Sequence, residues 1–548
     1  MRLMLLAAAA VVALSSASAS SAQPAADLVI WGGPVYTGAA PARAEALAVS
    51  GNRIVFVGDR AGAQAKVGPQ TQIVDLKGAA LFPGFTDAHA HLRGIGEREL
   101  SLNLEGSKSA AEAVGRVKAY LSQRKPTGPV WGRGWIETGW PEGRFLERGD
   151  LDAIAPDQPV LLVRADGHAL VANSAALKAA GIDETTPAPA GGDILKGKDG
   201  KPTGLLVDNA MSLVGKLRRA PTEADRREAF DAAFKVETAY GWTGVHAMSV
   251  DWADVLLLEE MNAAGGSPLR VYNAVDGEEA GPLFSGGPRT TKDRLIVTQA
   301  IKLYQDGALG SRGAALFDPY ADAPGTTGLV LTPPAAMRAA MEKAKAAGIQ
   351  VASHAIGDRG NANVLDLYKS VGVKDLRWRI EHAQVVRPSD IPRFADMGVI
   401  ASMQPSHAIG DLHFAPARLG GPRLDGAYAW DGMRKAGVLV AGGSDAPVER
   451  GAPLVEFYAA VARKDLSGFS GPDWRPEQAL SREEALKLFT SAAAYARFAE
   501  TELGTLEVGK LADLSAFSVD LMTAPEAEIP KGRAVLTVVD GKVVYRAP

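Results

Sequence analysis

Cysteine is absent from this sequence of 548 residues. Its absence excludes disulfide bonds, thiolate ligands for metal ions and a cysteine nucleophile. If the protein binds a metal ion, the ligands must therefore be histidine, carboxylate or a modified lysine.

Blocks of like charge are also missing, and the formal net charge is only −4. Proteins that bind nucleic acid usually carry a basic patch, so the composition does not favour that function. With 47% hydrophobic and 22% charged residues, the chain has the composition of a globular enzyme. We therefore expect a small-molecule substrate and no nucleic-acid partner, with homo-oligomerisation left open.

A membrane-spanning apolar run is lacking as well. The apolar run from Leu3 to Leu14 has 12 residues, whereas a spanning helix needs roughly 18 to 20. Arg2 precedes this run, and small residues from Ser15 to Ala22 follow it. This order is typical of a secretory signal peptide. We predict a cleaved signal over residues 1–22 and a secreted or periplasmic mature protein without a membrane span.

Both ends of the remaining chain contain short β-rich runs separated by turn residues, such as Leu28 to Tyr36 and Val535 to Val539. They predict a small β-sandwich built from residues 23–78 and 504–548. Between them, apolar segments alternate with helical stretches, which is typical of an α/β protein with a (β/α)8 TIM-type barrel over 79–503. The interval around 92–240 exceeds one crossover and predicts an insertion, in which Trp131, Trp135 and Trp140 are pocket walls or core residues.

Eight segments are candidate barrel strands, the number that a closed barrel requires. They are Ala79–Pro83, Gly244–Met248, Val271–Val275, Ala300–Tyr304, Ile349–His354, Arg377–His382, Val399–Gln404 and Val438–Gly442.

Metal-binding residue types follow several of these segments. His89 and His91 follow the first one, and His354, His382 and Asp445 stand at the ends of three others. Barrel enzymes place their catalytic groups at the carboxyl ends of strands. Because imidazole and carboxylate suit zinc and related divalent ions, the ensemble predicts a metal site.

Lys302 is unusual because strand alternation points it into the barrel while Ile301 and Leu303 face the helices. A charged lysine inside a barrel needs a partner. One explanation is carboxylation of its amine to an anionic bridge between two metals. The other is a salt bridge with Asp306, and the sequence leaves both open.

The stretch Phe82–His91, followed in order by Lys302, His354, His382 and Asp445, resembles the amidohydrolase superfamily. Four further segments resemble its YtcJ-like branch, which includes N-substituted formamide deformylase: Arg164–His168, Asp306–Arg312, His354–Arg359 and Ile380–Ala383. The resemblance covers nearly all of the chain after residue 22.

The resemblance implies a binuclear zinc-type hydrolase of a C–N bond in an amide, N-formyl or carbamate compound. His89, His91 and Asp445 would hold one ion, His354 and His382 the other, and carboxylated Lys302 would bridge them. A metal-bound hydroxide would attack, with Asp445 as general acid and base. The candidates for substrate binding are His168, Asp306, Arg312 and Gln404.

Other functions remain open at this stage. The chain could be an exported acyl-amino or dipeptide-type peptidase, or a mononuclear enzyme in which Lys302 is an ordinary cation. It could also be a non-catalytic metal-binding or ligand-sensing barrel, although no ligand of the motif is missing. Among the other histidines, His407 and His413 follow the seventh predicted strand as substrate contacts or solvated loop residues, and His246 stands at a strand end that is often less polar.

Overall fold

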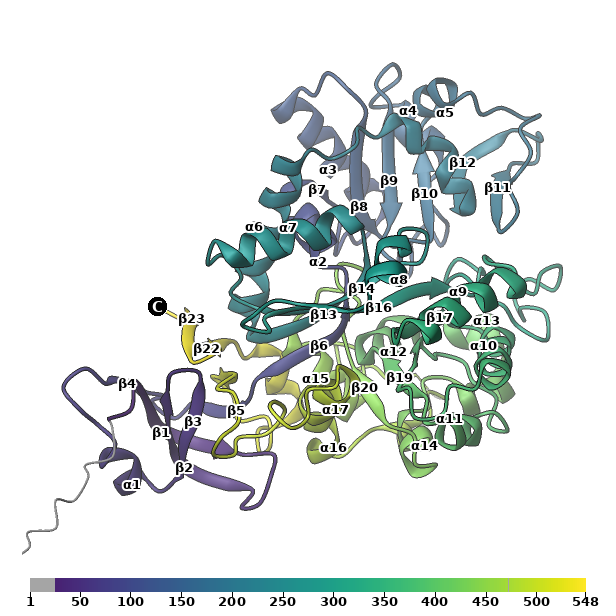
Figure 1. Cartoon of the computed structure of the whole chain (residues 1–548). Coiled ribbons are helices and arrows are strands. Elements are labelled where there is room, and N and C mark those ends of the chain that lie inside the picture. Colours follow the sequence, from purple (N-terminus) through teal and green to yellow (C-terminus); the bar gives the residue numbers. More distant parts are fainter. Residues whose placement is uncertain (1–24, 472) are drawn as a thin grey trace, which may run out of the picture.

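The computed structural model describes residues 25–471 and 473–548, so the predicted signal peptide lies outside the described residues. The chain forms three sheets: a barrel, an insertion above it, and a sheet shared by the two ends of the chain (Figure 1). Among the described helices, none has the length and apolar character needed to cross a bilayer.

The central sheet is a TIM-type α/β barrel of eight parallel strands. Their order is β6 (Phe85–Ala90), β13 (Trp242–Val250), β14 (Arg270–Asp276), β16 (Ile296–Tyr304), β17 (Gln350–Ala355), β18 (Arg379–His382), β19 (Ile400–Met403) and β20 (Val440–Gly442). A short strand, β15 (Arg289–Thr290), pairs with β16 from outside this path. Seven of the eight predicted strands are confirmed.

The first predicted strand is wrong. Ala80–Pro83 forms β5, which pairs antiparallel with β21 (Leu514–Phe517) in the terminal sheet, and the barrel strand begins only at Phe85. Gly84 joins β5 to β6 at a position too close to Thr243 for a side chain, because a Cβ atom there would lie 2.4 Å from the Thr243 hydroxyl oxygen. One apolar run therefore supplies two strands to two different sheets.

The barrel closes between β20 and β6 without a regular ladder. The amide of Asp445 donates to the His89 carbonyl at 2.7 Å, and the amide of His91 donates to the Ala446 carbonyl at 2.7 Å. Ser444 Oγ donates to the Asp87 carboxylate at 2.5 Å, and a Cβ atom on Gly443 would lie 2.4 Å from the His89 nitrogen. This closure brings the two ends of the barrel sequence together at the site described below.

Helices surround the barrel and cover its outer apolar face. They are α6 (Glu223–Tyr240), α7 (Trp252–Ala263), α8 (Gly281–Gly286), α9 (Pro334–Ala346), α10 (Asp358–Val371), α11 (Ile391–Met397), α12 (Pro405–Asp411), α13 (Ala415–Leu419), α14 (Trp430–Lys435), α15 (Pro453–Ala462), α16 (Arg482–Phe489) and α17 (Ser491–Ala496). Their buried side chains and those of the strands form the largest hydrophobic cluster of the molecule.

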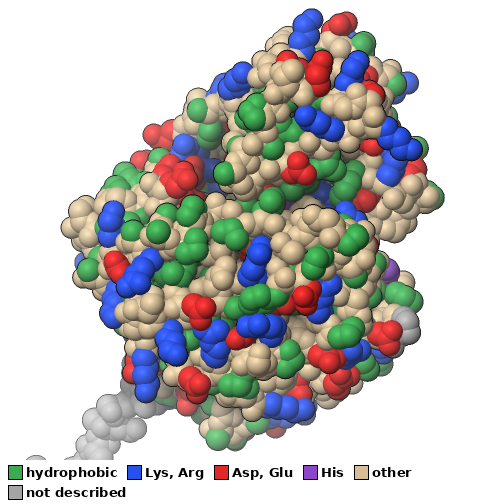
Figure 2. Space-filling model, turned by 90° about the vertical axis from the view of Figure 1, so that its right-hand side faces the viewer, with side chains coloured by type: hydrophobic (Ala, Val, Ile, Leu, Met, Phe, Trp, Pro, Cys, Tyr) green, Lys and Arg blue, Asp and Glu red, His purple; other side chains and the backbone are tan. Residues whose placement is uncertain are grey.

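The insertion after α2 (Leu92–Leu100) has a six-stranded sheet of its own. The strand order is β11 (Gly192–Lys196), β12 (Pro202–Asp208), β10 (Ala169–Ala172), β9 (Val160–Arg164), β8 (Val130–Trp135) and β7 (Leu102–Asn103), with helices α3 (Ala110–Arg124), α4 (Arg148–Asp152) and α5 (Ser174–Ala180). Trp135 and Trp140 are buried in its core. Figure 2 shows positive and negative side chains intermixed over the visible face of the molecule.

Strands from both ends of the chain share the third sheet. Its order is β23 (Lys542–Arg546), β22 (Ala534–Val539), β21, β5, β1 (Leu28–Tyr36), β2 (Arg43–Ser50) and β3 (Arg53–Gly58), with β4 (Gln72–Asp75) paired to β1 and α1 (Arg60–Gln64) beside it. These eight strands form one hydrogen-bonded sheet, seven along the path and β4 beside it. A two-layered sandwich therefore stays a prediction.

Candidate metal centre

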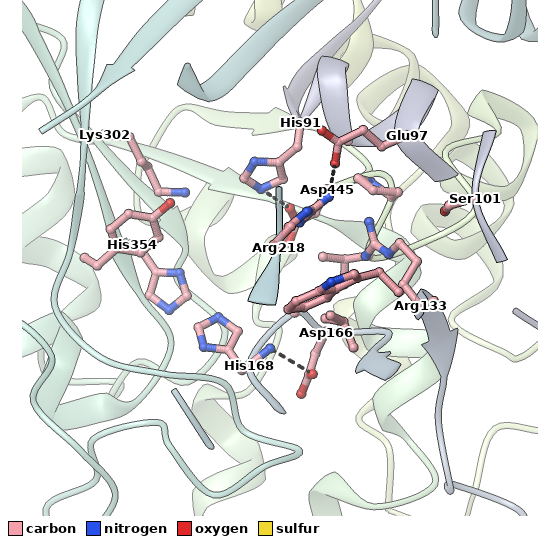
Figure 3. A pocket seen from close by; sticks show the side chains of 18 of the residues that line it. His91, Glu97, Ser101, Arg133, Asp166, His168, Arg218, Lys302, His354 and Asp445 are labelled. Carbon is pink, nitrogen blue, oxygen red and sulfur yellow. Dashed lines mark hydrogen bonds and ion pairs between the residues drawn. The ribbon is translucent and has the colours of Figure 1, made fainter. Parts of the chain in front are cut away.

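Six predicted ligands lie at the carboxyl ends of the barrel strands, and four of them, His91, Lys302, His354 and Asp445, are labelled in Figure 3. His89 is the penultimate residue of β6 and His91 is the N-cap of α2, Lys302 and His354 stand on the neighbouring strands β16 and β17, His382 ends β18, and Asp445 follows β20. All are buried except His91, whose side chain is 30% exposed. The parallel arrangement explains the convergence, because strand ends from distant sequence positions meet at one edge.

Asp445 joins the first group of ligand atoms. His91 Nε2 lies 3.1 Å and His89 Nε2 lies 3.4 Å from the same oxygen, Asp445 Oδ1. The three ligand atoms of this group lie within 4.8 Å of one another. Asp445 Oδ1 is buried and has no hydrogen-bond partner among the described residues. A buried carboxylate oxygen that faces two imidazole nitrogens fits a divalent metal ion.

A second group uses the other oxygen of the same carboxylate. His407 Nε2 lies 3.6 Å and His382 Nδ1 lies 3.8 Å from Asp445 Oδ2. His407 stands on α12, directly after β19, and its buried Nε2 also lacks a described partner. The predicted ligand sets did not include His407. The sequence placed His407 after a barrel strand, which is where site residues are expected. It did not show that α12 directs the His407 side chain toward Asp445.

His354 and Lys302 lie beside these groups without belonging to either. The rings of His354 and His382 are 4.5 Å apart between centroids. Lys302 Nζ lies 3.4 Å from His89 Nε2, and within the described residues Lys302 forms no ion pair. The alternative salt bridge with Asp306 is therefore not formed. Burial lowers the pKa of the Lys302 ammonium, which favours the neutral amine.

A buried ion pair lies behind His89. Glu381 Oε2 is 2.5 Å from His89 Nδ1, and Arg379 donates to Glu381 Oε1 at 2.7 Å. Burial alone would raise the pKa of Glu381, but Arg379 and His89 outweigh it and lower the pKa to about 2. A carboxylate on Nδ1 fixes the ring so that Nε2 faces the ligand position. The motif Ile380–Ala383 contained Glu381, but its role was not predicted.

Arg379 also contacts His246 and accounts in part for its low pKa. Its guanidinium lies 2.8 Å from His246 Nδ1, inside the barrel. His246 is therefore buried among barrel residues, and its pKa is held well below the usual range by burial and by Arg379. His413 pairs with Asp465 at 3.0 Å and has a side chain that is 38% exposed, so it lies away from the ligand groups.

The structure separates the four candidates for substrate binding. His168 lines the cavity, with its ring 5.3 Å from that of His354 and its Nδ1 2.6 Å from Asp208 Oδ1. Burial disfavours the imidazolium, but Asp208 outweighs it and raises the pKa of His168 to about 9. Gln404 Oε1 lies 2.9 Å from His382 Nδ1, the same nitrogen that lies 3.8 Å from Asp445 Oδ2, so Gln404 is a hydrogen-bond partner of that ring.

Asp306 and Arg312 bond mainly to other partners, and Asp306 Oδ1 also lies 3.7 Å from His354 Nε2. Asp306 accepts backbone hydrogen bonds from Ala315, Ile356 and Gly357 at 2.8 to 2.9 Å, and burial raises its pKa to about 7. Arg312 pairs with Asp322 at 2.9 Å. Neither residue lines the cavity, so the structure assigns Asp306 to holding loops in place, and substrate binding by either stays a prediction.

A cavity of about 360 Å³ opens between the barrel and the insertion. The barrel side contributes five of the six predicted ligands, all but His89, together with Tyr304, and the insertion contributes Trp131, Arg133 and His168. A smaller cavity of about 60 Å³ adjoins it and shares His168 and Asp445 with it. Asp445 therefore lines both cavities, and the insertion forms one wall of each.

The chain belongs to the Amidohydrolase family, whose model matches residues 72–545. The protein is therefore of a hydrolase class that includes metal-dependent enzymes. The family match confirms the predicted resemblance to the amidohydrolases.

Particular relatives cover almost the whole chain. The chain is 36% identical over 530 residues to the amidohydrolase YtcJ of Bacillus subtilis (strain 168), with 94% of this chain and 99% of that protein covered. It is 29% identical over 520 residues to the N-substituted formamide deformylase of Arthrobacter pascens, with 92% and 95% covered. Its fold is similar to that of a metal-dependent hydrolase of Pyrococcus horikoshii OT3, with a TM-score of 0.75 and 28% identity. The comparison covers 91% of this chain and 99% of that chain.

Proposed function

We propose that this chain hydrolyses a C–N bond in an amide, N-formyl or carbamate compound with two divalent metal ions, zinc by default. The observation that carries the proposal is the shared carboxylate of Asp445, which faces one pair of imidazoles with Oδ1 and another pair with Oδ2. The similarity to an N-substituted formamide deformylase supports the N-formyl class.

His89, His91 and Asp445 would hold one ion, and His382 and His407 with Asp445 the other, with His354 beside the second. Paired ions would supply an activated water at neutral pH and polarise the scissile carbonyl. Nitrogen and oxygen donors of this kind suit zinc better than magnesium or calcium.

Lys302 would join the site as a carbamate. In that reaction the ammonium first loses one proton, and the neutral amine then attacks the carbon of CO2 and loses a second proton, so that a cation becomes an anion. The buried position supports this step, because burial lowers the pKa of the amine and no described carboxylate forms an ion pair with it. The resulting charge would suit a position 3.4 Å from His89 better than an ammonium does.

Asp445 and His168 would move protons on the substrate. Burial would raise the pKa of Asp445, but the charges of the facing histidines outweigh it and hold the pKa well below its usual range. Asp445 is therefore ionised at neutral pH and can take a proton from the attacking water and deliver it to the leaving nitrogen. His168, protonated below about pH 9, can donate a hydrogen bond to the carbonyl oxygen or to the leaving group.

Metal content tests the proposal. We would purify the native chain, Lys302→Ala and Lys435→Ala from cells grown with zinc and bicarbonate, and measure ions per chain by mass spectrometry. Lys435 is an exposed lysine of α14 and serves as the matched control. We expect about two ions in the native and control proteins and a clear loss in Lys302→Ala.

Each other outcome selects a different function. About one ion in all three proteins would exclude the bridge and favour a mononuclear hydrolase. No ion in any of them would favour a non-catalytic barrel. Turnover of N-formyl and N-acyl compounds, compared with dipeptides, then separates an amidase from a peptidase. We also propose export after cleavage within the first 22 residues, which the mass of the protein secreted by its host would test.

A further inference from the structure

Strand β8 of the insertion directs two side chains toward the candidate metal centre. Trp131 and Arg133 alternate with Val130 and Gly132 along the strand, and both line the cavity that contains Asp445. At Gly134 the backbone has φ of 96° and the strand pairing shifts, so that Trp135 turns back into the insertion core. This irregularity leaves Arg133 as the last side chain of β8 to face the barrel.

Arg133 has no acidic partner among the described residues. Its Nη2 donates to the carbonyl oxygen of Ala165 at 3.2 Å, and its Nε is buried without a hydrogen-bond partner. A guanidinium with N–H groups that make no hydrogen bond retains donors for a ligand.

The other two arginines that line these cavities are satisfied. Arg164 pairs with Glu137 at 2.9 Å and with Asp166 at 2.5 Å. Arg218 pairs with Glu97 at 2.9 Å at the more exposed rim, and its guanidinium lies 5.4 Å from the Trp131 ring. The absence of a counter-ion at Arg133 is therefore a local feature and not a general shortage of carboxylates.

The position of Arg133 disfavours its charge in the absence of an anion. Burial and the neighbouring Arg98 lower the pKa of Arg133 to about 10 against the opposing charges of Asp445, Glu105 and Glu97, so it is still a cation at neutral pH. A partly buried cation without an ion-pair partner costs free energy, which a bound anion would recover. In Figure 3 Arg133 lies on the other side of the cavity from Lys302 and His354.

We infer that Arg133 binds a carboxylate of the substrate, and that the substrate is therefore an N-acyl or N-formyl amino acid. The inference rests on the proposed function for the scissile bond, while the carboxylate is assigned from the insertion alone. A single planar guanidinium matches the two oxygens of a carboxylate. The ring of Trp131 and the side chains of Tyr304 and Val163 provide apolar walls in the same cavity.

Binding measured without turnover tests this assignment. We would remove the metal from the native chain with a chelator, so that no turnover occurs, and titrate N-formyl-phenylalanine and its methyl ester, which differ in the negative charge, by calorimetry. We expect the acid to bind about 10- to 100-fold more tightly than the ester, as expected for a hydrogen bond to a charged group. Adding Arg133→Met should abolish the difference, and Arg133→Lys should restore part of it.

The matched control is Arg218→Met, which removes a rim arginine that already has Glu97 as partner. It should keep the preference for the acid. Equal affinity for acid and ester, or a preference that survives Arg133→Met in a protein with an unchanged melting temperature, would overturn the inference. Inorganic phosphate that competes with the acid more strongly than acetate does would also overturn it, because the site would then select a phosphoryl group.

Turnover by the zinc-loaded native protein distinguishes the two proposals. If it hydrolyses neither the acid nor the ester but the Arg133-dependent binding difference persists, the proposed hydrolysis fails and the carboxylate site stands. If it hydrolyses both at equal kcat/KM and Arg133→Met changes neither rate, the hydrolase stands and the carboxylate site fails.

Discussion

Single residues of the site stand in unusual backbone conformations. Asp445 has φ of 59° and His382 has φ of 74°, both in the left-handed region that non-glycine residues rarely occupy. Such conformations persist only where the surroundings hold them, and they occur often at functional sites. Here Asp445 is held by a hydrogen bond of 2.7 Å, which its backbone amide donates to the His89 carbonyl oxygen. Ligand geometry is thus fixed by the closure of the barrel.

His168 and Asp208 give a pH-dependent contribution to stability. The folded pKa of His168 is about 9, above the ordinary value near 6.5, so the pair stabilises the fold fully below about pH 6.5. This contribution is lost as the pH rises through about 9. Asp208→Asn should therefore lower the free energy of unfolding at pH 6 by up to about 3 kcal/mol and much less at pH 10.

Urea denaturation at both pH values measures this difference. Asp193→Asn, a change of an exposed carboxylate on β11, is the control and should have little effect at either pH. An equal loss of stability by Asp208→Asn at pH 6 and pH 10 would contradict the raised pKa of His168.

Among the elements, α2 connects the metal centre to the insertion. His91 is its N-cap residue, and the helix packs closely on α6, because a Cβ atom on Gly96 would lie only 1.7 Å from the Ala229 carbonyl oxygen. Gly96→Ala should force the two helices apart, lower the free energy of unfolding by about 1 to 3 kcal/mol and reduce metal content by displacing His91.

The control for this prediction lies on α3. A Cβ atom on Gly115 would meet no other atom within 4 Å, so Gly115→Ala should stabilise the protein by about 0.5 to 1 kcal/mol. Thermal unfolding and metal analysis of both variants measure the effects. Normal stability and normal metal content in Gly96→Ala would show that α2 and α6 are not packed this tightly.

At the scale of the whole molecule, Arg270 joins the barrel to the terminal sheet. From β14 its guanidinium donates to Asp513 at 2.7 Å and to Asp540 at 2.7 Å. Arg270 and Asp513 are buried. Arg270→Met would leave uncompensated carboxylates at this junction and should cost about 3 to 5 kcal/mol.

Chemical denaturation compares this variant with Arg338→Met, which breaks an exposed pair with Glu342 and should cost less than about 1 kcal/mol. We expect the Arg270 variant to lose stability or to unfold in two steps, with the terminal sheet separating first. A denaturation curve equal to that of the Arg338 variant would refute the role of this junction.

Much of the barrel could be predicted because its strands are apolar runs separated by helices, and the seven strands from β13 to β20 lie where that pattern placed them. The run around Phe82 and Phe85 could not be divided in the same way. Both β5 and β6 are buried, and hydrophobicity alone does not specify that β5 pairs with β21 and β6 with β13.

The sequence by itself determined the family, the barrel and most of the candidate ligands, because residue type and strand-end position are local properties. Only the tertiary structure decided that His407 joins His382 at Asp445, that Arg312 turns away to Asp322, and that Arg133 enters the cavity without a counter-ion. These outcomes depend on how an insertion and a loop helix pack over the barrel, and such packing is fixed by contacts between residues far apart in the chain.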